Sequence, residues 1–308
     1  MVMPTNIRAI DLMMQIPTSG GRKRYEFLQP LLLDRESREK FDFPAEYMFK
    51  SVPSTPPARD GVRATLDEMD RVGIERAMIG VTLRRSAGDG GGRRAEMDSI
   101  DAEGNAENLR AVREHPDRFF ASFEVNPNRG AEGGRDLVRA YEQFGIKAAT
   151  AFPAGLSPQV PINDKKFYPI YANCVELNIL ICVCAGVPGP RVPMMAQDVA
   201  LIDEVGRFFP ELKFVTRHGC EPWTELAVKL MLKWPNLYYS TSAFAPKYYP
   251  KAIVDFANTR GKEKVLYAVY YPMRLSLERI FRQMPHVPFH DDVWPLFLRE
   301  NARRVFDV

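Results

Sequence analysis

Eight short apolar runs, separated by longer helical patterns, constrain the fold of this chain most. Segments such as GVRATLDEMDRVG and RDLVRAYEQFG place apolar residues at helical spacing and end in glycine. This alternation is typical of βαβ units on a parallel sheet. Eight repeats favour an α/β fold of the (β/α)8 TIM-barrel type over a doubly wound sheet. The runs expected to be strands are 7–14, 74–81, 119–126, 146–152, 179–185, 212–218, 237–243 and 265–271.

The length and spacing of the runs predict one domain over residues 1–308. A closed barrel commonly accommodates a chain of this length, and 45% hydrophobic residues are enough for a large core. A long insertion, 15–57, follows the first run, and a second long segment, 82–101, follows the second run. Both follow strand ends at the barrel face where sites are built. The GDGGGRR stretch within 82–101 lacks the spacing of a phosphate-binding loop, so we interpret it as a surface loop.

Charge and composition exclude several classes of function. The net charge of +3 is small and the basic residues are scattered, so no nucleic-acid partner is expected. Neither a signal peptide nor an apolar run long enough to span a membrane is evident, so we predict no membrane association and a cytoplasmic location. The cysteines are then expected to be reduced thiols. They are Cys174, Cys182, Cys184 and Cys220.

Several segments together resemble a known family. AIDLMMQ is similar to an IDxHxH opening, ICVCAG to a fifth strand that ends in HxG, and FVTRHGC to a sixth strand that ends in His-Gly. KVLYAVYYP and ENARRVF are similar to the eighth strand and the closing helix. The chain therefore resembles the amidohydrolase-related (amidohydrolase 2) proteins, which include decarboxylases, lactone hydrolases and a few oxygenases. The resemblance implies a barrel of the metal-dependent amidohydrolase type.

The resemblance also implies a divalent metal, but most positions of its ligands are changed. In such enzymes two histidines after strand one, a histidine after strand five and an aspartate after strand eight hold the metal. Here those positions are Met13, Gln15, Cys184 and Tyr270. Only the histidine after strand six remains, as His218, so no cofactor is expected in this chain. Asp11 matches a position that mainly supports the first strand.

The remaining candidate residues each allow two interpretations. His218 is either a general base or inherited and unused. Cys184, His218 and Cys220 form either a substitute zinc site or ordinary buried side chains. Tyr270 and Tyr271 are interpreted as side chains that fill the mouth, with Tyr270 and Arg84 as candidate substrate-binding residues. The basic residues of the second long segment either bind a carboxylate or lie in solvent. They are Arg84, Arg85, Arg93 and Arg94.

Three functional hypotheses follow. The first is a non-catalytic partner subunit that forms a hetero-oligomer with a metal-bearing paralogue. Among the resembled proteins, 2-aminoisobutyric acid hydroxylase is an oxygenase of two related subunits, and the chain resembles the subunit without the reacting centre. The second hypothesis is a metal-independent lactone or ester hydrolase with His218 as base. The third is a hydrolase with a replaced zinc site made of Cys184, His218 and Cys220.

Overall fold

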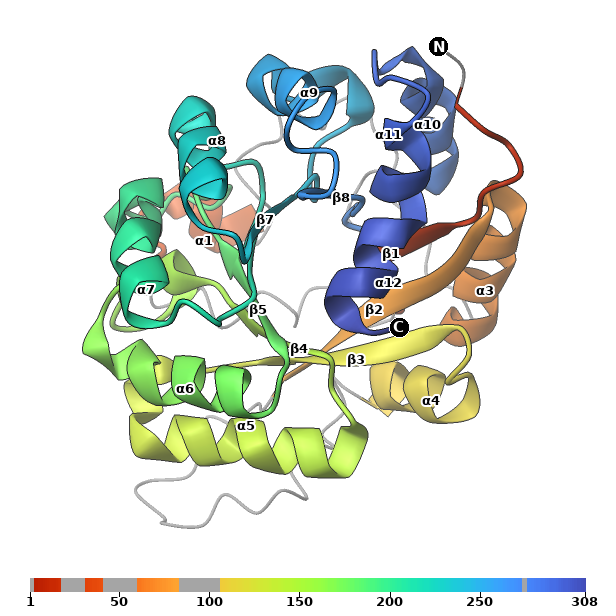
Figure 1. Ribbon diagram of the computed structural model, residues 1–308. Helices are drawn as coiled ribbons and strands as arrows, with labels where there is room; N and C mark the ends of the chain where they lie inside the picture. The colour runs from red at the N-terminus through yellow and green to blue at the C-terminus, as the bar shows by residue number, and fades with distance from the viewer. Residues whose placement is uncertain (1–2, 18–30, 41–59, 83–105, 273–275) are drawn as a thin grey trace.

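The computed structural model describes residues 3–17, 31–40, 60–82, 106–272 and 276–308. Within these ranges eight parallel strands lie in the order β1 to β8 (Figure 1). The last strand reaches the first through a bridge between Met14 and Tyr271. The Gln15 amide also donates to the Tyr271 carbonyl oxygen at 3.0 Å. This nearly closed cylinder confirms the predicted (β/α)8 barrel.

All eight predicted strands are present, and most are shorter than the sequence runs. Residues at the beginnings and ends of the runs lie outside the parallel ladder, in the turns and loops that adjoin the strands. The strands are β1 (Ala9–Met14), β2 (Ile74–Thr82), β3 (Phe119–Glu124), β4 (Ala148–Ala151), β5 (Leu180–Cys184), β6 (Phe214–Arg217), β7 (Leu237–Ser240) and β8 (Val265–Leu266).

Strand β8 has two residues because side chains take over the hydrogen bonds of the residues that follow it. The Thr241 hydroxyl accepts from the Ala268 amide at 3.2 Å and donates to the Ala268 carbonyl oxygen at 3.1 Å. Asp11 Oδ1 accepts from the Val269 amide at 3.1 Å. These buried backbone groups are therefore satisfied without a β ladder.

Helices surround the cylinder (Figure 1). A π-helical turn, Leu296–Glu300, joins the last two of them. The helices are α1 (Arg35–Lys40), α3 (Gly61–Val72), α4 (Ala106–Glu114), α5 (Ala131–Phe144), α6 (Tyr168–Glu176), α7 (Ile202–Phe208), α8 (Thr224–Lys233), α9 (Lys251–Ala257), α10 (Leu277–Gln283), α11 (Val293–Pro295) and α12 (Asn301–Phe306).

Helix α3 shows how the sequence sets these elements. Asp60 begins it, and its carboxylate accepts from the Val62 and Arg63 amides at 3.1 Å each. Gly73 ends it with φ of +84°, a conformation that glycine adopts without a steric penalty. The helix buries the face that carries Val62 and Met69. The two capping residues fix where α3 begins and ends, and its apolar face packs it onto the barrel, so the chain enters β2 directly after the helix.

Two apolar layers make up the core. The outer layer lies between strands and helices, and the inner layer fills the cylinder with side chains such as Phe120, Val215 and Tyr238. Helix α12 adds Val305 and Phe306 to the inner layer. The Asn301 amide donates to the carbonyl oxygens of Lys262 and Val265, at the beginning of β8, so α12 closes the end where the strands begin.

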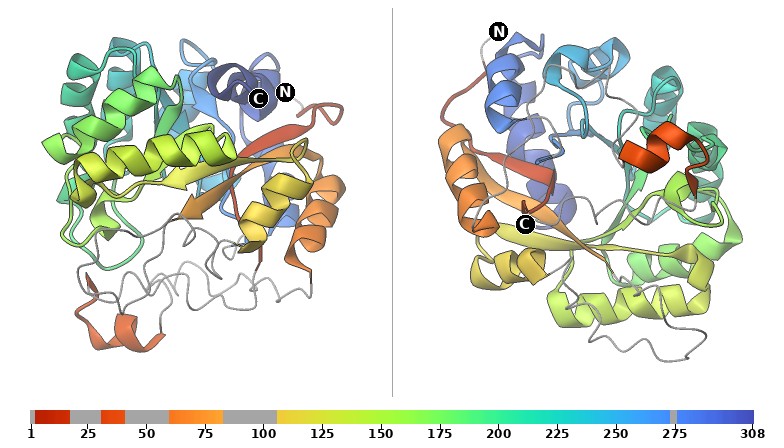
Figure 2. Two further views of the ribbon diagram at one scale, coloured as in Figure 1. Left: turned by 90° about the horizontal axis from the view of Figure 1, so that it is seen from below. Right: turned by 180° about the vertical axis from the view of Figure 1, so that it is seen from behind.

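The opposite end of the barrel, where the strands end, is its mouth. Figure 2 shows α1 and the C-terminus at opposite ends of the molecule. Arg191, in the segment after β5, donates to Asp34 at 2.8 Å and to Glu36 at 2.9 Å, which ties α1 to this end. The carboxylates of Asp34 and Glu36 therefore serve in ion pairs.

Much of the two long predicted segments lies outside the described residues. Of the insertion 15–57, the structure describes 15–17 and 31–40, and of 82–101 it describes only residue 82. The assignment of residues 1–308 to one domain stays a prediction. None of the helices in the described ranges is both long and apolar enough to cross a lipid bilayer.

Candidate functional site

The side chains at the mouth continue the alternation of the inner core. Successive side chains of a strand point to opposite faces, so residues two apart share a face. Cys182 and Val215 lie in the inner layer. Cys184 and Arg217, each two residues later, therefore face the barrel axis, and they are register partners across β5 and β6. Glu124 ends β3 on the same face as Phe120 of the inner layer.

Strand β6 ends in a turn with left-handed backbone. His218, Gly219 and Cys220 have φ of +65°, +93° and +59°. This conformation costs a residue with a Cβ about 1–2 kcal/mol. Strand β7 and the residues directly after it hold the turn: the Ser242 hydroxyl accepts from the His218 amide at 3.1 Å, and the Tyr239 hydroxyl donates to the Gly219 carbonyl oxygen at 3.3 Å. The surrounding barrel therefore stabilises a conformation that the local sequence disfavours.

The imidazole of His218 is held between two partners. Its Nδ1 lies 3.3 Å from the Ser242 hydroxyl oxygen, and its ring stacks on Tyr270 with centroids 5.3 Å apart. Burial, followed by the nearby charge of Arg217, lowers the pKa of His218 to about 3. The ring is therefore neutral near pH 7. A base with so low a pKa accepts a proton weakly, because general bases work best with a pKa near the operating pH.

The cysteines are buried neutral thiols. Burial raises the pKa of Cys184 to about 11 and the pKa values of Cys182 and Cys220 to about 12. Cys220 packs in the outer layer, whereas Cys184 faces the barrel axis. The structure therefore does not bring Cys184, His218 and Cys220 together, and no three His, Cys, Asp or Glu side chains in the described ranges are placed to share a metal ion. The left-handed turn directs Cys220 away from the mouth.

Asp11 joins β1 to the chain after β8. Its Oδ1 accepts from the Met13 amide at 2.9 Å and from the Val269 amide at 3.1 Å, while its Oδ2 is buried without a partner. Burial outweighs both hydrogen bonds and raises the pKa of Asp11 to about 7. The side chain acts where the barrel closes, as a support for the first strand.

The two tyrosines after β8 have different places. Tyr270 contacts His218 and packs against the inner layer, as expected for a side chain that fills the mouth. Tyr271 lies in the outer layer, where burial raises the pKa of its phenol to about 12. The interpretation of Tyr271 as a mouth residue is therefore wrong. Successive side chains of an extended chain point to opposite faces, so Tyr270 and Tyr271 lie on opposite sides of the barrel wall.

The side chains at the implied ligand positions do not fit a divalent metal of the family type. Met13 offers a thioether within the apolar inner layer, Cys184 a neutral thiol, and Tyr270 a phenol stacked on His218. Gln15 offers a neutral amide whose Oε1 is buried without a hydrogen bond. Manganese prefers imidazole and carboxylate ligands, which are missing from these four positions, and zinc also accepts a thiolate, whereas Cys184 is a neutral thiol here.

Sequence reasoning missed Arg217. It is partly buried, and its Nε is buried without a hydrogen-bond partner. The signal was present in the sequence, because Arg217 is two residues after the apolar Val215 and directly before His218. A charged residue on the inner face of a barrel strand is rarely structural unless it is paired.

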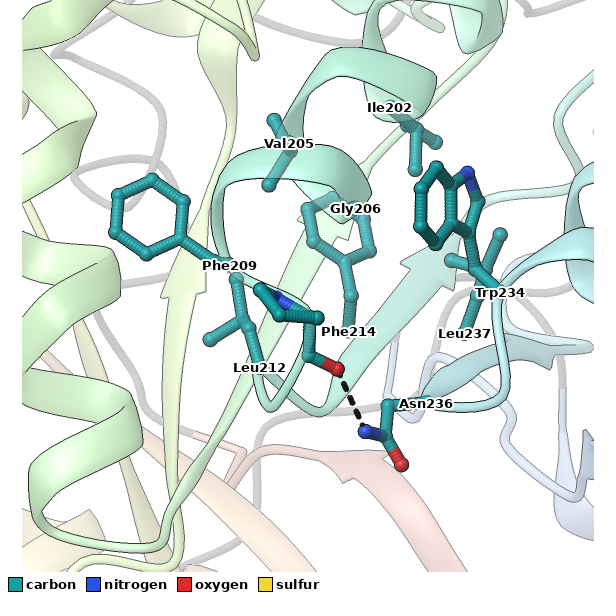
Figure 3. A pocket seen from close by; sticks show the side chains of 10 residues that line it. Ile202, Val205, Gly206, Phe209, Leu212, Phe214, Trp234, Asn236 and Leu237 are labelled. Atoms are coloured by element: carbon teal, nitrogen blue, oxygen red, sulfur yellow. Dashed lines mark hydrogen bonds between the residues drawn. The ribbon is translucent and has the colours of Figure 1, made fainter.

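An apolar hollow lies away from this mouth, between α7, α8 and the beginnings of β6 and β7 (Figure 3). Phe209, Phe214 and Trp234 line it. The Asn236 amide donates to the Pro210 carbonyl oxygen at 2.8 Å at its edge. No titratable side chain lines the hollow, so we interpret it as a gap in helix-to-strand packing.

The candidate arginines after β2 lie outside the described residues. Arg84, Arg85, Arg93 and Arg94 belong to 83–105, so their predicted role in binding a carboxylate stays a prediction. The same holds for a substrate-binding role of Tyr270, whose position at the mouth is compatible with it.

Solved structures share this fold along nearly their whole length. An uncharacterised TIM-barrel protein from Bordetella bronchiseptica has a TM-score of 0.70 and 20% identity, and the match covers 98% of this chain and 99% of that one. The 5-carboxyvanillate decarboxylase of Novosphingobium aromaticivorans, with bound manganese, has a TM-score of 0.67 and 16% identity over 99% and 98% of the two chains. The 4-oxalomesaconate hydratase of Rhodopseudomonas palustris has a TM-score of 0.63 and 16% identity over 97% and 95%.

At these identities the structural likeness establishes the fold alone. No curated protein matches the chain in sequence. The family model described as amidohydrolase matches residues 39–308, which include seven of the eight strands and the closing helix α12. Because this match spans most of the chain, the protein belongs to the amidohydrolase family.

Proposed function

We propose that this chain is a non-catalytic partner subunit of a metal-bearing member of the same family. One observation carries the proposal: Met13, Gln15, Cys184 and Tyr270 stand where the family's metal ligands are expected, within a complete eight-stranded barrel. Metal-hydroxide chemistry needs an ion held by several protein ligands, which in the resembled family are imidazoles and a carboxylate. A barrel without them can still serve an assembly through its surface.

In this proposal the metal and the reaction belong to the partner. The decarboxylase from Novosphingobium aromaticivorans was solved with manganese, so manganese is one metal to seek in the partner. The more specific form of the proposal is an oxygenase pair such as 2-aminoisobutyric acid hydroxylase, in which this chain takes the place of the subunit without the reacting centre.

Exposed apolar side chains offer the partner two contact regions. Tyr248, between β7 and α9, is 60% exposed, although Tyr249 beside it is buried. Lys247 Nζ lies 4.4 Å from the centre of the Tyr248 ring, so the pair presents an aromatic face with a positive edge. Leu33, directly before α1, is 80% exposed. Aromatic side chains of this kind are enriched at the centres of interfaces.

The metal-independent hydrolase has weaker support. Its proposed base, His218, has a pKa of about 3, and its Nδ1 faces the buried Ser242 hydroxyl. One feature favours hydrolysis: the guanidinium of Arg217 is suited to stabilise an oxyanion. Hydrolysis that is lost in His218→Ala and indifferent to chelators would favour it over the partner role.

The first experiment compares the chain expressed alone with the chain expressed together with its nearest family relative from the same genome. Elemental analysis measures metal, and light scattering measures mass. We expect little metal in the lone chain, and a stable complex that carries all of its metal in the relative. A lone chain that holds about one metal ion per molecule and ignores its relative would contradict the proposal.

A matched pair of variants locates the interface. Tyr248→Asp is expected to weaken the complex at least about tenfold, because it removes an aromatic contact and buries a charge. Tyr141→Asp, on α5 at the other side of the barrel, should leave affinity unchanged (Figure 1). Equal affinity for both variants would exclude the Tyr248 region as the contact, and circular dichroism checks that both are folded.

A further inference from the structure

We propose that the partner subunit presents an acidic surface to a basic patch around Tyr248, which we call the Tyr248 patch. It consists of Tyr248, Lys247, Arg279 and Arg282. This inference rests on the proposed partner role and adds the charge of the surface that the partner must present. The patch lies where the segment after β7 meets α10, and none of its residues stands at an implied metal-ligand position.

The side chains of the Tyr248 patch come from two segments that contact each other. Pro246–Tyr248 forms a 3-10 turn after β7, and this turn packs against α10, which carries Arg279 and Arg282. Lys247 Nζ lies 4.4 Å from the centre of the Tyr248 ring. The hydrogen bond to Lys247, and then the charges of Lys247 and Arg279, lower the pKa of the Tyr248 phenol. Both cations therefore lie beside the exposed ring.

The basic side chains of the patch carry charges that the protein leaves available. Among the residues that the structure describes, none of the three forms an ion pair, whereas the carboxylates nearest to them in sequence already have partners. Glu278 lies 3.7 Å from Arg71, and Asp255 pairs with Lys251. Carboxylates of another chain would meet three positive charges here.

The turn beneath Tyr248 holds its ring ready for contact. The Tyr248 amide donates to the Ala245 carbonyl oxygen at 2.8 Å, and Pro246 restricts the backbone at the beginning of the turn. Tyr249 is buried, and its hydroxyl donates to Met284 Sδ at 4.0 Å. A segment that is fixed before association loses little conformational entropy on binding. Tyrosine and arginine are also the residue types that often dominate the binding energy of an interface.

The chemistry of the patch favours an acidic protein surface over a nucleic acid. Three cations around one aromatic ring match a few carboxylates, and the guanidinium of Arg279 can hold one of them through two parallel N–H donors. Proteins that bind duplex nucleic acid often contact about 6–10 phosphates, and the net charge of +3 for the whole chain is small. Opposite charges on two protein surfaces also steer their association, which makes the rate depend on salt.

Association is measured between the purified full chain and its nearest family relative from the same genome. The rate constant is recorded at about 0.05 M and about 0.5 M NaCl, between which the screening length falls about threefold. We expect association to slow by about tenfold or more at the higher salt concentration, because the charges on the two surfaces are then screened.

A matched pair of variants assigns the salt dependence to the patch. Arg279→Glu should slow association by about tenfold at low salt, and the difference should shrink at high salt. Arg207→Glu makes the same change of net charge at an exposed position of α7, away from α10, and should stay within about twofold of the unmodified chain (Figure 1). Thermal unfolding checks that both variants are folded.

The outcomes separate this inference from the partner role. A complex that forms equally fast at both salt concentrations, or that responds alike to Arg279→Glu and Arg207→Glu, would overturn the acidic surface and leave the partner role standing. Two chains that do not associate at all would overturn the partner role, and this inference with it. A DNA duplex that binds the lone chain, and binds Arg279→Glu more weakly, would assign the patch to nucleic acid instead.

Discussion

The two ends of the barrel are built on different principles. At the end where the strands begin, α12 fills the cylinder with Val305 and Phe306, and Arg304 donates to the Glu263 carbonyl oxygen at 2.7 Å. At the mouth, the Nε of Arg217 and the Oε1 of Gln15 are buried without partners. The closed end is filled by apolar side chains of α12, whereas the mouth carries polar and charged side chains; buried atoms without a hydrogen bond occur at both ends, and Asn301 Oδ1 is one at the closed end. In barrels of this type stability is concentrated at the first end and function at the second.

Backbone geometry also differs between the ends, although single left-handed residues occur at the closed end too, where Asn178 and Asp307 follow helices. The closing helix α12 is held by side chains that cap the beginnings of strands, such as Asn301. The mouth contains the left-handed turn of His218, Gly219 and Cys220. Strained conformations persist only where surrounding structure enforces them, and they gather at functional sites.

The largest expected effect is at the closed end. Phe306→Ala should lower the free energy of unfolding by about 3–5 kcal/mol, because it leaves a cavity against Phe120, whose ring centroid lies 6.1 Å away. Denaturant unfolding measures the change. Phe208→Ala, where the side chain is 56% exposed on α7, should change stability by less than about 0.5 kcal/mol. Similar losses of stability in both variants would mean that Phe306 contributes no more to stability than an exposed phenylalanine does.

The next effect is on pH dependence where the barrel closes. The pKa of Asp11 is raised from 3.8 to about 7, so the folded state keeps a proton that the unfolded chain has lost. Stability from this group is therefore present below about pH 4 and falls as pH rises through 7. At about 1.4 kcal/mol per pKa unit, the loss amounts to a few kcal/mol.

Asp11→Asn isolates this contribution. Its amide oxygen can accept from the Met13 and Val269 amides as Oδ1 does, but it does not titrate. Unfolding measured from pH 4 to pH 8 should show the unmodified protein losing stability relative to the variant. Parallel curves for the two proteins would mean that Asp11 ionises normally and that the closure of the barrel is better solvated than its burial indicates.

A smaller effect is expected in the strained turn. Gly219→Ala should cost about 2–3 kcal/mol, because φ is +93° and a Cβ would come within 2.4 Å of the Phe244 ring. Gly73→Ala, at φ of +84° with open space around it, should cost only about 1 kcal/mol. Chemical denaturation of both variants measures the difference. Equal losses of stability in the two variants would show that the Phe244 ring moves aside and that the turn is not tightly held.

The smallest predicted effect concerns the support of His218. Ser242→Ala removes the acceptor of the His218 amide and should lower the free energy of unfolding by about 1–2 kcal/mol. Thr5→Ala, at an exposed position near the N-terminus, serves as the control. If both variants unfold at the same denaturant concentration, the hydrogen bond to Ser242 contributes nothing measurable and water replaces it.

The sequence by itself determined the barrel. Strand and helix periodicity depend on residues that are near in sequence, so the eight runs predicted the strands and their order along the chain. The changed identities at Met13, Gln15, Cys184 and Tyr270 were likewise readable without coordinates, because a side chain's donor chemistry does not depend on its surroundings. Strand ends were less predictable, since Asp11 and Thr241 replace the ladder after β8 through contacts between distant segments.

Tertiary structure alone decided how these side chains behave at the mouth. Cys220 follows His218 closely in sequence, yet the left-handed turn directs it into the outer layer. Burial and the charge of Arg217 make His218 a weak base, which no local pattern predicts. Among the described residues the Nε of Arg217 has no hydrogen-bond partner, and this too is a property of the fold, because it depends on which groups distant segments bring to the same end. Local periodicity determined the scaffold, whereas solvation and long-range proximity determined the chemistry of its mouth.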